Sequence, residues 1–480
     1  MNYISDIVTK EEIDLWEQGQ RILIHSQTGS GKSHFIKNNL YEYCLENDKK
    51  ILLLSNRTIL KDQNSNDLEG KLDIVHPENY QLLETRVLHG EDINDLFIKY
   101  DYIIYDECHY LFSDSQFSRT TDLLIEPLIN TPENKIFVFM TATPDAVLMC
   151  QPKFHHKYTI PFDYSYINNI YFYSKSSTIN QILSGIPDNE KVIYFSSNAM
   201  DAYELSLRYP DSDFICSESN SRLKRRRSQT AVNDIINHNT FYSKLLCTTK
   251  VLDNGVNLID KNIKHIIIDM LDPTTLIQCI GRRRIVENDD GITLYIKNYH
   301  GGYLYSQVDA LNKKLKYVKD LETMGIDTFK YTYRKYDFDD VIQNDFTINK
   351  SKLINYQISH KYYLQMMMDK DKSGYKKMVY RLLNQPRGSF QSAESKFEKE
   401  TLSDVMEPLI NQKMFGEEID NFKTRFFENI FDSKKVDYRK RGILCTNAIL
   451  QEDNLPYQII SSQETKGKYR KKRYWMVIRK

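Results

Sequence analysis

A loop of small residues followed by a lysine and a serine is the sharpest chemical signal in the sequence. The segment SQTGSGKS, residues 26–33, directly follows the apolar run RILIH and precedes a segment of helical composition. A triphosphate requires converging backbone N–H groups, a backbone free of bulky side chains, an ammonium group for the β- and γ-phosphates and a hydroxyl for Mg²⁺. Gly29, Gly31, Lys32 and Ser33 supply these parts. The loop therefore predicts a nucleoside triphosphate site with magnesium.

Two adjacent carboxylates end another strongly apolar run. In YDYIIYDECHYLF, residues 100–112, Asp106 and Glu107 directly follow the apolar segment. At the carboxyl end of a parallel strand, such a pair reaches both a metal ion and an attacking water. We expect Asp106 to hold the magnesium ion and Glu107 to orient or deprotonate the water. A solvated strand end is the alternative for an isolated pair, but the position after the phosphate loop favours catalysis.

A third apolar run, KIFVFMTATP at residues 135–144, ends in two threonines. We expect the hydroxyls of Thr141 and Thr143 to hydrogen-bond the carboxylates of the neighbouring strand and to report the nucleotide state. Taken alone this signal is weak, because Thr-x-Thr is common at strand ends.

Three consecutive arginines follow a glutamine in TLIQCIGRRRI, residues 275–285. We place Gln278 and the arginines Arg282, Arg283 and Arg284 at the start of a helix, where cations are unfavourable unless an anion is present. A γ-phosphate held by the other half of the chain would be that anion. An arginine that reaches a phosphate across an interface accelerates phosphoryl transfer by about 10³–10⁵. A solvated basic turn is the alternative.

Eight short apolar runs in the first 300 residues are typical of strands inside a covered parallel sheet. Most are separated by segments long enough for a crossover helix, such as residues 34–47 and 222–237, so the series predicts repeated βαβ units. After about residue 300 the pattern becomes helical, with candidate helices at 303–324 and 350–384. The predicted strands are residues 21–26, 50–55, 102–105, 135–140, 191–195, 244–247, 265–269 and 291–296.

Composition describes a globular chain of several domains. At roughly 150 residues per domain, 480 residues allow about three domains. The 65 basic residues balance 65 acidic ones, so any surface for a polyanion must be a local patch. Seven scattered cysteines without a Cys-x-x-Cys pair predict a reduced, cytoplasmic protein without structural zinc. No signal peptide or membrane span is predicted.

The order of these motifs resembles the superfamily 2 helicases, ATP-driven motors with two RecA-like domains, and specifically DEAD/DEAH-type proteins of bacteria and their mobile elements. SQTGSGKS is similar to motif I, in which this family tolerates Ser26 in place of glycine. The resemblance extends over residues 15–300. The other similar segments are LLLSNRTILKDQ (52–63, motif Ia), DECH (106–109, II), TAT (141–143, III, with Thr for the usual Ser), YFSSN (194–198, IV), TTKVLDNGVN (248–257, V) and QCIGRRR (278–284, VI).

The resemblance implies an α/β fold of two tandem RecA-like P-loop domains with parallel sheets, residues 1–162 and 163–300, then a mostly helical accessory domain, residues 301–480. ATP would bind between the two lobes, and closure of the lobes would bring Gln278, Arg282 and Arg284 to the γ-phosphate. The common motif VI has its second arginine three residues after the first, where Ile285 stands, so Arg282 and Arg284 share the finger role.

Further roles follow only from the resemblance. Coupling between the nucleotide and the lobes is implied for His109, Thr141 and Thr143. ATP contacts are implied for Ser26, Gln27, Thr28, Gly29, Ser30, Gly31, Lys32, Ser33, Asp253 and Gly255. Contacts with the nucleic-acid backbone are implied for Asn56, Arg57, Thr249 and Asn254.

The neutral total charge hides a basic C-terminal segment. Residues 434–480 hold 13 Lys or Arg against four acidic residues. A helix at 446–452, an extended stretch at 457–463, a basic turn at 466–473 and a final strand resemble the helix and wing of a winged helix. A solvated hairpin is the alternative. The segment RLKRRR at 222–227 is either a patch that follows phosphates or a solvated helix face. Candidate nucleic-acid ligands are Lys468, Arg470, Lys471, Lys472 and Arg473, with Tyr469, Tyr474 and Trp475 as candidates for base stacking.

Together these features predict an ATP- and Mg²⁺-dependent nucleic-acid helicase or translocase without membrane association. Single-stranded or forked DNA is the expected partner, on the basis of the resemblance and the basic segment. Three alternatives stay open: a duplex translocase that does not separate strands, an RNA helicase, and a nucleotide-switched scaffold with a vestigial motor.

Overall fold

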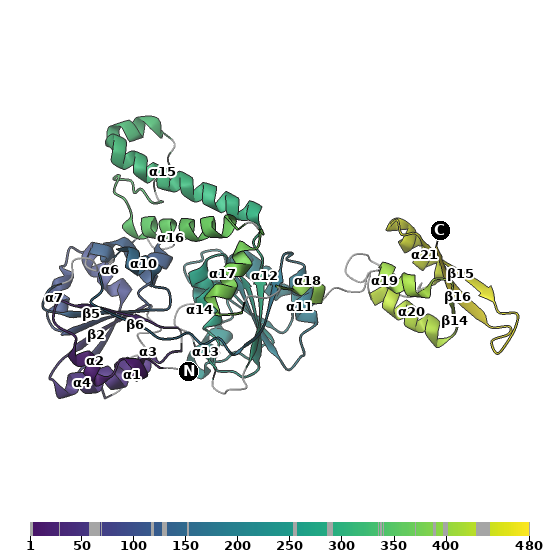
Figure 1. The fold of residues 1–480 in the computed structure, drawn as a ribbon, viewed down its shortest axis with the longest axis horizontal. Coiled ribbons are helices and arrows are strands. Elements are labelled where there is room, and N and C mark those ends of the chain that lie inside the picture. Colours follow the sequence, from purple (N-terminus) through teal and green to yellow (C-terminus); the bar gives the residue numbers. More distant parts are fainter. Residues whose placement is uncertain are drawn as a thin grey trace. The chain divides into compact units, whose positions relative to one another are not determined.

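The computed structural model of the 480-residue chain divides into two compact units, Met1–Ala393 and Glu394–Lys480 (Figure 1). The structure describes residues 3–27, 29–56, 68, 70–116, 120–126, 132–150, 153–252, 257–285, 291–334, 336, 338, 340–369, 371–386, 390–396, 402–428 and 442–479. The first unit holds two parallel sheets and the second holds a small antiparallel sheet.

A six-stranded parallel sheet organises the first lobe, which we define as the part of the first unit that holds β1 to β6. The strand order is β3-β2-β4-β5-β1-β6. Strands β2 and β5 are buried at every position, as expected for a parallel sheet covered on both faces. The strands are β1 (Arg21–His25), β2 (Ile51–Ser55), β3 (Val75–Asn79), β4 (Tyr102–Asp106), β5 (Ile136–Thr141) and β6 (His156–Thr159).

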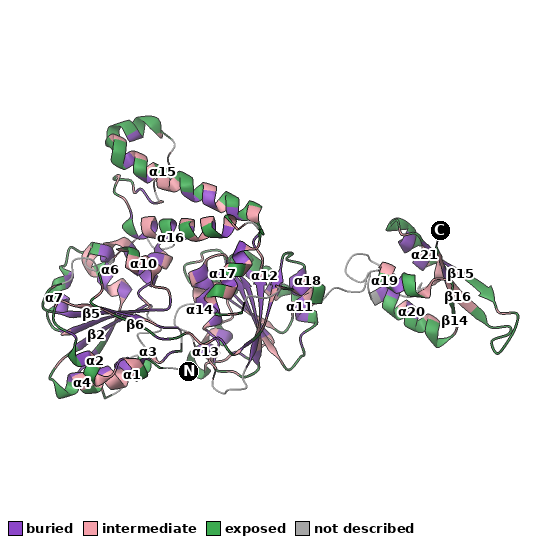
Figure 2. Cartoon of the chain, in the orientation of Figure 1, coloured by how far each residue is buried: buried purple, intermediate pink, exposed green. Residues whose placement is uncertain are grey.

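Alternate residues of these strands point into two separate apolar cores, one on each face of the sheet (Figure 2). Ile22 and Ile24 pack with α1, α2 and the helical segment after the phosphate loop, whereas Leu23 packs on the opposite face with α6 and α7. The helical elements are α1 (Ile4–Ile7), α2 (Lys10–Asp14), α3 (Lys32–His34), the π-helix η1 (Phe35–Leu40), α4 (Tyr41–Glu46), α6 (Tyr80–Leu88), α7 (Ile93–Phe97), α8 (Tyr110–Ser113), η2 (Asp114–Gln116), η3 (Thr121–Leu124) and α10 (Asp145–Cys150).

A seven-stranded parallel sheet, in the order β13-β7-β12-β11-β8-β10-β9, organises the second lobe. Its strands are β7 (Ile167–Tyr173), β8 (Lys191–Ser196), β9 (Ser212–Ile215), β10 (Leu245–Thr248), β11 (Ile263–Asp269), β12 (Ile292–Lys297) and β13 (Gln391–Ser392). Its helical elements are α11 (Thr178–Ser184), α12 (Ala199–Arg208), η4 (Lys224–Arg226), α13 (Gln229–His238), η5 (Lys250–Leu252) and α14 (Pro273–Ile280).

The predicted fold class, two α/β lobes with parallel sheets, is confirmed, and all eight predicted strands are present. Five strands were not predicted. Strand β3 carries His76 and Glu78, β6 alternates between intermediate and exposed residues, and β7 contains Asn168 and Asn169. Strands β9 and β13 have four and two residues. Apart from IYFY at residues 170–173 of β7, which the sequence analysis missed, none of these strands has the continuous apolar run that marks a central strand.

Three helices connect the two lobes: α15 (Gly301–Thr332), α16 (Lys350–Met367) and α17 (Gly374–Leu382). Helix α16 lies against α8 and α10 of the first lobe, where Tyr362 Oη donates to Asp145 Oδ2 at 2.6 Å (Figure 1). Helix α17 packs on α14 of the second lobe, and Tyr375 Oη donates to the Met270 carbonyl oxygen at 2.8 Å. These helices belong to the first compact unit, although we predicted an accessory domain from residue 301. The boundaries at residues 162 and 300 stay predictions.

The second unit is a helical layer on a three-stranded antiparallel sheet, in the order β14-β16-β15. Phe426, Leu450, Ile459 and Val477 are almost fully buried in its core. The predicted helix and hairpin are present. Helix α18 (Ala393–Lys396) spans the boundary between the units. The elements of the second unit are α19 (Leu402–Met406), η6 (Glu407–Leu409), β14 (Lys413–Met414), α20 (Glu417–Glu428), α21 (Ile443–Glu452), β15 (Tyr457–Gln463) and β16 (Arg473–Arg479).

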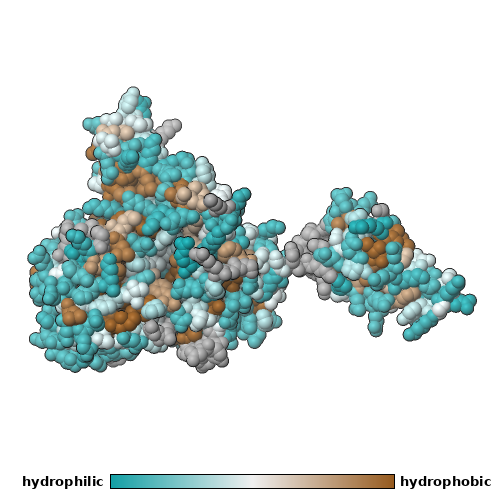
Figure 3. All heavy atoms as spheres, viewed as in Figure 1, coloured by the Kyte–Doolittle hydropathy of each residue, from teal (hydrophilic) through white to brown (hydrophobic). Residues whose placement is uncertain are grey.

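Hydrophilic residues predominate on the face of the molecule drawn in Figure 3. Among the described residues, no helix combines the length and the apolar character needed to cross a membrane.

The first residue of α17 provides a test of the contact between α16 and α17. A Cβ atom at Gly374 would lie 2.0 Å from the Met366 carbonyl oxygen, so Gly374→Ala should force the two helices apart. We expect a loss of stability of about 1–3 kcal/mol and a lower midpoint of thermal unfolding. Gly301, the first residue of α15, has open space at the same position, so Gly301→Ala is the control and should gain about 0.4–1 kcal/mol. Equal midpoints for both variants would contradict this packing.

Candidate nucleotide site between the two lobes

The phosphate loop joins β1 to α3, as predicted. Gly29 and Gly31 have φ angles of 94° and 85°, in the left-handed region that glycine adopts without a steric cost. Lys32 then begins the helical segment, which runs through η1 and α4 to Glu46. The Ser30 carbonyl oxygen accepts a hydrogen bond of 3.1 Å from the Ile4 backbone N–H, so the amino-terminal helix braces the loop.

The two predicted carboxylates lie beside this loop. Lys32 Nζ donates a hydrogen bond to Glu107 Oε1, and both side chains are largely buried. The Glu107 backbone N–H donates to Asp106 Oδ1 at 3.1 Å. Glu107 has a φ angle of 49°, a conformation that costs free energy for a residue with a side chain and is typical of functional sites. The loop lysine and the carboxylates therefore form one site.

Opposite effects set the protonation of the two carboxylates. Burial raises the pKa of Glu107, but the positive charges of Lys32 and Arg282 and the hydrogen bond from Lys32 outweigh burial and hold this pKa well below its usual range. Burial also raises the pKa of Asp106, the nearby charge of Glu107 raises it further, and Lys32 opposes both effects. Glu107 is thus the fully ionised member of the pair at neutral pH.

A chain of hydrogen bonds crosses from the first lobe to the second. His109 Nδ1 lies 3.1 Å from Thr141 Oγ1, which also accepts from the Thr143 backbone N–H at 3.0 Å. Gln278 Nε2, from α14 of the second lobe, donates to His109 Nε2. This pattern requires a neutral imidazole that donates through Nδ1. Thr141 therefore bonds His109 rather than the carboxylates that we expected.

The arginine cluster follows a helix instead of starting one. Helix α14 ends at Ile280 with Gly281 as its C-cap, so our prediction that the arginines begin a helix was wrong. A helix C-terminus is favourable for cations, and the electrostatic argument for a bound anion does not apply there. Arg283 is buried in the second lobe, where its Nε donates to the Ile263 carbonyl oxygen at 3.2 Å.

The other two arginines lie at the boundary with the first lobe. Arg282 Nε donates to the Gln278 carbonyl oxygen at 3.1 Å, and its charge contributes to the low pKa of Glu107. Arg284 Nη1 lies 2.9 Å from the position that a Cβ of Gly29 would occupy. This nitrogen is buried and has no hydrogen-bond partner among the residues that the structure describes. Burial lowers the pKa of Arg284 to about 10, so the guanidinium stays charged at neutral pH.

Two features of this boundary were not predicted. Lys250 of η5 lies 3.3 Å from Asp114 Oδ1 and 3.4 Å from the Ser113 carbonyl oxygen, which forms an ion pair between the lobes. Asn257 Oδ1 accepts from Arg284 Nε at 2.7 Å. Both residues lie inside the segment that resembles motif V, which is the signal that could have identified them.

The remaining predicted residues have varied environments. Ser33 is exposed at the helix start, and the Gln27 side chain bonds both backbone groups of Asp163, at 3.2 and 2.8 Å. Ser26 and Asn56 are buried, so Asn56 does not present its amide to a ligand in this arrangement. Thr249 Oγ1 accepts from the Val251 backbone N–H. Thr28, Arg57, Asp253, Asn254 and Gly255 lie outside the described residues, and Lys468, Arg470, Lys471, Lys472 and Arg473 lie in the second unit.

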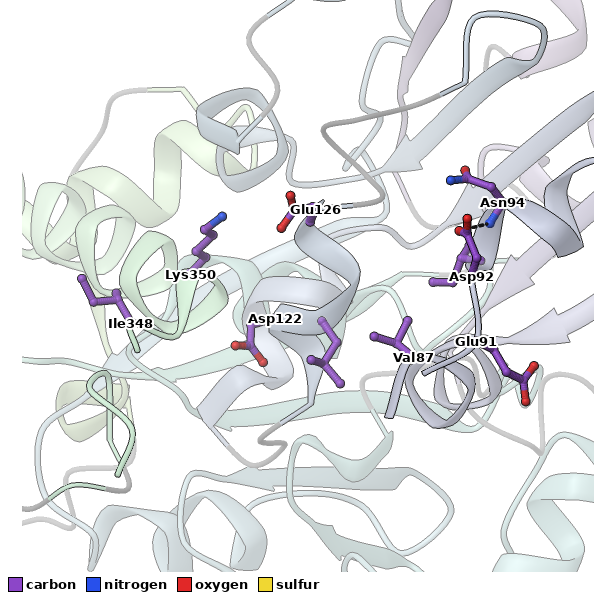
Figure 4. Close-up of a pocket in the computed structure, with 10 residues that line it drawn as sticks. Val87, Glu91, Asp92, Asn94, Asp122, Glu126, Ile348 and Lys350 are labelled. Atoms are coloured by element: carbon purple, nitrogen blue, oxygen red, sulfur yellow. Dashed lines mark hydrogen bonds between the residues drawn. The ribbon is translucent and has the colours of Figure 1, made fainter. Parts of the chain in front are cut away.

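A cavity of about 550 Å³ lies elsewhere, between the α6–α7 connection, η3 and the start of α16 (Figure 4). Four carboxylates and one lysine supply its charged groups. No residue that we predicted to contact ATP is part of its described lining. The charged residues are Glu91, Asp92, Asp122, Glu126 and Lys350.

Residues 7–149 match the DEAD/DEAH box helicase family. No curated protein matches the sequence. The chain is similar to a variant of S. cerevisiae Dbp5 bound to RNA and ADP BeF3, with 13% identity and a TM-score of 0.43 over 60% of this chain and 83% of that one. It is also similar to Mss116p bound to ssRNA and AMP-PNP, with 13% identity and a TM-score of 0.46 over 80% of this chain and 86% of that one. Because both scores are below 0.5, the fold assignment rests on the two parallel sheets.

The matched segment, residues 7–149, contains the phosphate loop and the carboxylate pair. The predicted enzyme class, an ATP-dependent helicase, is the class that this family defines. The DECH subtype and a bacterial or mobile-element origin stay predictions.

The hydrogen bond between His109 and Gln278 predicts a dependence of stability on pH. Burial lowers the pKa of His109 to about 4, although Glu107 opposes this. The unfolded chain, with an ordinary histidine pKa of about 6.5, therefore binds a proton between pH 6.5 and 4 that the folded chain does not bind. The difference between the two pKa values of His109 therefore contributes to the free energy of unfolding. This contribution is fully present above pH 6.5 and is lost as the pH falls from 6.5 to about 4. Urea unfolding at several pH values should show a steeper decline for wild type than for His109→Asn, and identical slopes would contradict the prediction.

The ion pair between Lys250 and Asp114 predicts rescue by charge exchange. Lys250→Glu and Asp114→Lys each place like charges together at the lobe boundary, so each should lower the ATPase rate. The double variant restores the attraction, and the coupling free energy from the double-mutant cycle should be about 0.5–3 kcal/mol. Strictly additive losses would show that the pair does not hold the lobes together.

Proposed function

We propose that the chain is an ATP-dependent nucleic-acid helicase or translocase that binds ATP between its two lobes. One observation carries the proposal: the unpaired Arg284 Nη1 of the second lobe points at Gly29 of the phosphate loop, beside the Lys32 and Glu107 pair. A phosphate placed there meets Lys32 from one lobe and arginines from the other. Charge-assisted contacts from both sides are what phosphoryl transfer requires.

Each side chain has a distinct role in this proposal. The triphosphate competes with Glu107 for the Lys32 ammonium, and its arrival leaves the Glu107 carboxylate available to orient the attacking water. A carboxylate oxygen of Glu107 can accept a hydrogen bond from this water, which suits the orienting role. Arg282 and Arg284 stabilise the charge that develops on the transferred phosphoryl group.

Magnesium fits the donor set on chemical grounds. The Ser33 hydroxyl and the Asp106 carboxylate are oxygen donors, which Mg²⁺ prefers in proteins. These two residues would hold the ion, which supplies charge neutralisation for the phosphates when it is bound.

Movement along a strand follows from the dependence of lobe closure on the phosphate. When the γ-phosphate leaves, Arg282 and Arg284 lose the anion that draws the lobes together, and the hydrogen bonds through His109 transmit this change between the lobes. Single-stranded or forked DNA is the proposed polymer, on the basis of the motif resemblance and the basic C-terminal segment. RNA is the second candidate.

Removal of the loop lysine tests the proposed nucleotide site. Lys32→Ala should abolish nucleic-acid-stimulated ATPase activity, because it removes the loop ammonium group that pairs with the β- and γ-phosphates, and should leave the circular dichroism spectrum unchanged. Lys10→Ala is the matched control, since Lys10 also pairs with a glutamate, Glu46, but on the surface at 2.8 Å. Turnover of the Lys32 variant close to that of wild type would remove the assignment.

Comparison of polymers tests the substrate. ATPase activity is measured with single-stranded DNA, duplex DNA, forked DNA and RNA, together with strand displacement on the forked substrate. Stimulation by RNA alone would make the chain an RNA helicase, and ATPase activity without displacement would make it a duplex translocase. A Glu107→Gln protein that binds ATP and turns over as fast as wild type would instead favour a nucleotide-switched scaffold.

A further inference from the structure

The hairpin of the second unit ends in a loop that concentrates positive charge. We define the basic loop as residues 466–473, which hold six cations in eight positions. All six residues are exposed, and the tip of the hairpin between β15 and β16 has the colour of exposed residues in Figure 2. None forms an ion pair with another residue in the described part of the chain. The cations are Lys466, Lys468, Arg470, Lys471, Lys472 and Arg473.

The nearest carboxylate in the hairpin does not neutralise this charge. Glu464 is paired with Lys413 at 2.6 Å, and its Oε1 accepts from the backbone N–H groups of Thr465 and Lys466. The attraction of Lys413 and these hydrogen bonds lower the pKa of Glu464. The Glu464 carboxylate is therefore paired with Lys413 and with the backbone at the start of the loop, rather than with a cation of the loop.

The loop is held in a defined conformation despite the repulsion between its charges. Backbone hydrogen bonds of 2.9 and 2.8 Å link Glu464 to Lys472 and Lys471, and another of 3.1 Å links Arg470 to Gly467. Gly467 and Lys471 have positive φ angles of 75° and 68°. Like charges that are fixed close together repel one another, and a polyanion relieves this repulsion.

Two aromatic residues near the loop, Tyr469 and Trp475, contact other aromatic rings of the second unit. Tyr469 stacks on Phe415 with ring centroids 4.4 Å apart, and the ammonium groups of Lys468 and Lys472 lie 5.7 and 5.6 Å from the Tyr469 ring centroid. Trp475 packs edge-on against Phe422. Tyr469 stays 40% exposed, so its stacking on a base stays a prediction, as does that of Trp475. The loop nevertheless offers one partly covered ring, whereas single-strand binders stack successive bases on several aromatic side chains.

The helix before the hairpin does not add to the charge. Asn447 fixes α21 to β15 through hydrogen bonds of 2.8 and 2.7 Å with the backbone of Ile459. The exposed positions of α21, Leu444, Ala448, Gln451 and Glu452, include no lysine or arginine. Within residues 442–479, contacts with phosphates must therefore come mainly from the basic loop.

We propose that the basic loop binds the phosphate backbone of a nucleic-acid double helix without reading its sequence. A duplex presents one charge per roughly 1.7 Å of its axis, about twice the density of one strand, which suits a fixed cluster of cations with one partly covered ring. This proposal specifies the proposed function further, because it names a duplex as the substrate that the second unit binds. It rests on the proposed function only for the biological role of this binding.

The test is the salt dependence of binding by the full chain, measured by fluorescence anisotropy without nucleotide. The variant replaces Lys466, Lys468, Arg470 and Lys472 by Gln, and the probes are a 30-base-pair DNA duplex, the matching RNA duplex, a single strand of the same length and anionic lipid vesicles. Each lost phosphate contact lowers the slope of log K against log salt by about 0.9, so the slope on duplex should fall by about 3–4. The single strand should show a smaller change.

The control removes the same number of charges elsewhere. Arg222, Lys224, Arg225 and Arg226 form an exposed cluster in the second lobe, and their replacement by Gln should change the slope on duplex by less than one contact. An unchanged slope for the loop variant, an equal loss in the control, tighter binding to the single strand, or tighter binding to vesicles would each overturn the proposal. Binding without nucleotide does not require ATP hydrolysis, so failure of the ATPase experiments leaves this test intact.

Discussion

The first unit depends on a buried polar contact between its two lobes. Gln278 and His109 are each about 3% exposed and satisfy each other across the boundary, while Thr141 satisfies the second nitrogen of the imidazole. A buried polar group that loses its partner costs about 1–3 kcal/mol. The lobes therefore separate only if water or a ligand replaces these partners, so the contact favours an all-or-none transition over gradual opening.

The contact between the two lobes also brings charged side chains of both lobes together. Because the lobes meet at the carboxyl end of β4, Lys32, Glu107 and Arg284 are brought into one partly buried region where charges interact more strongly than in water. Fixed charges of both signs around one small volume suit the phosphate that we propose for this site. The family match of residues 7–149 agrees with this reading for the first lobe.

The strands and the phosphate loop were predictable because their signals are local. A central parallel strand is a continuous apolar run, and the loop needs glycine at positions such as Gly29 and Gly31, whose φ angles are positive. The arginine cluster was only half predictable. The motif resemblance singled out its residues as a group, but no local pattern distinguishes Arg283, which points into the second lobe, from Arg284, which points at the first.

Tertiary partners decided the features that the sequence analysis missed. Lys250 and Asp114 pair although they are 136 positions apart in the sequence. No local sequence pattern around either residue indicates this partner. Tyr469 lies beside cations in the sequence, but the stacking of Phe415 on its ring joins residues that are far apart in the chain and could not be predicted. The expected start of a helix at the arginines failed because α14 begins earlier, at Pro273 with Asp272 as its cap.

The helices α16 and α17 have a mechanical consequence. Helix α16 is bonded to Asp145, just after the threonines of β5, and α17 is bonded to Met270, just before the helix that carries Gln278. Helices α16 and α17 therefore link the two lobes at a place separate from the candidate nucleotide site. In the proposed motor, release of the contacts at the candidate nucleotide site leaves the lobes linked through α16 and α17, which restrict how the lobes can separate.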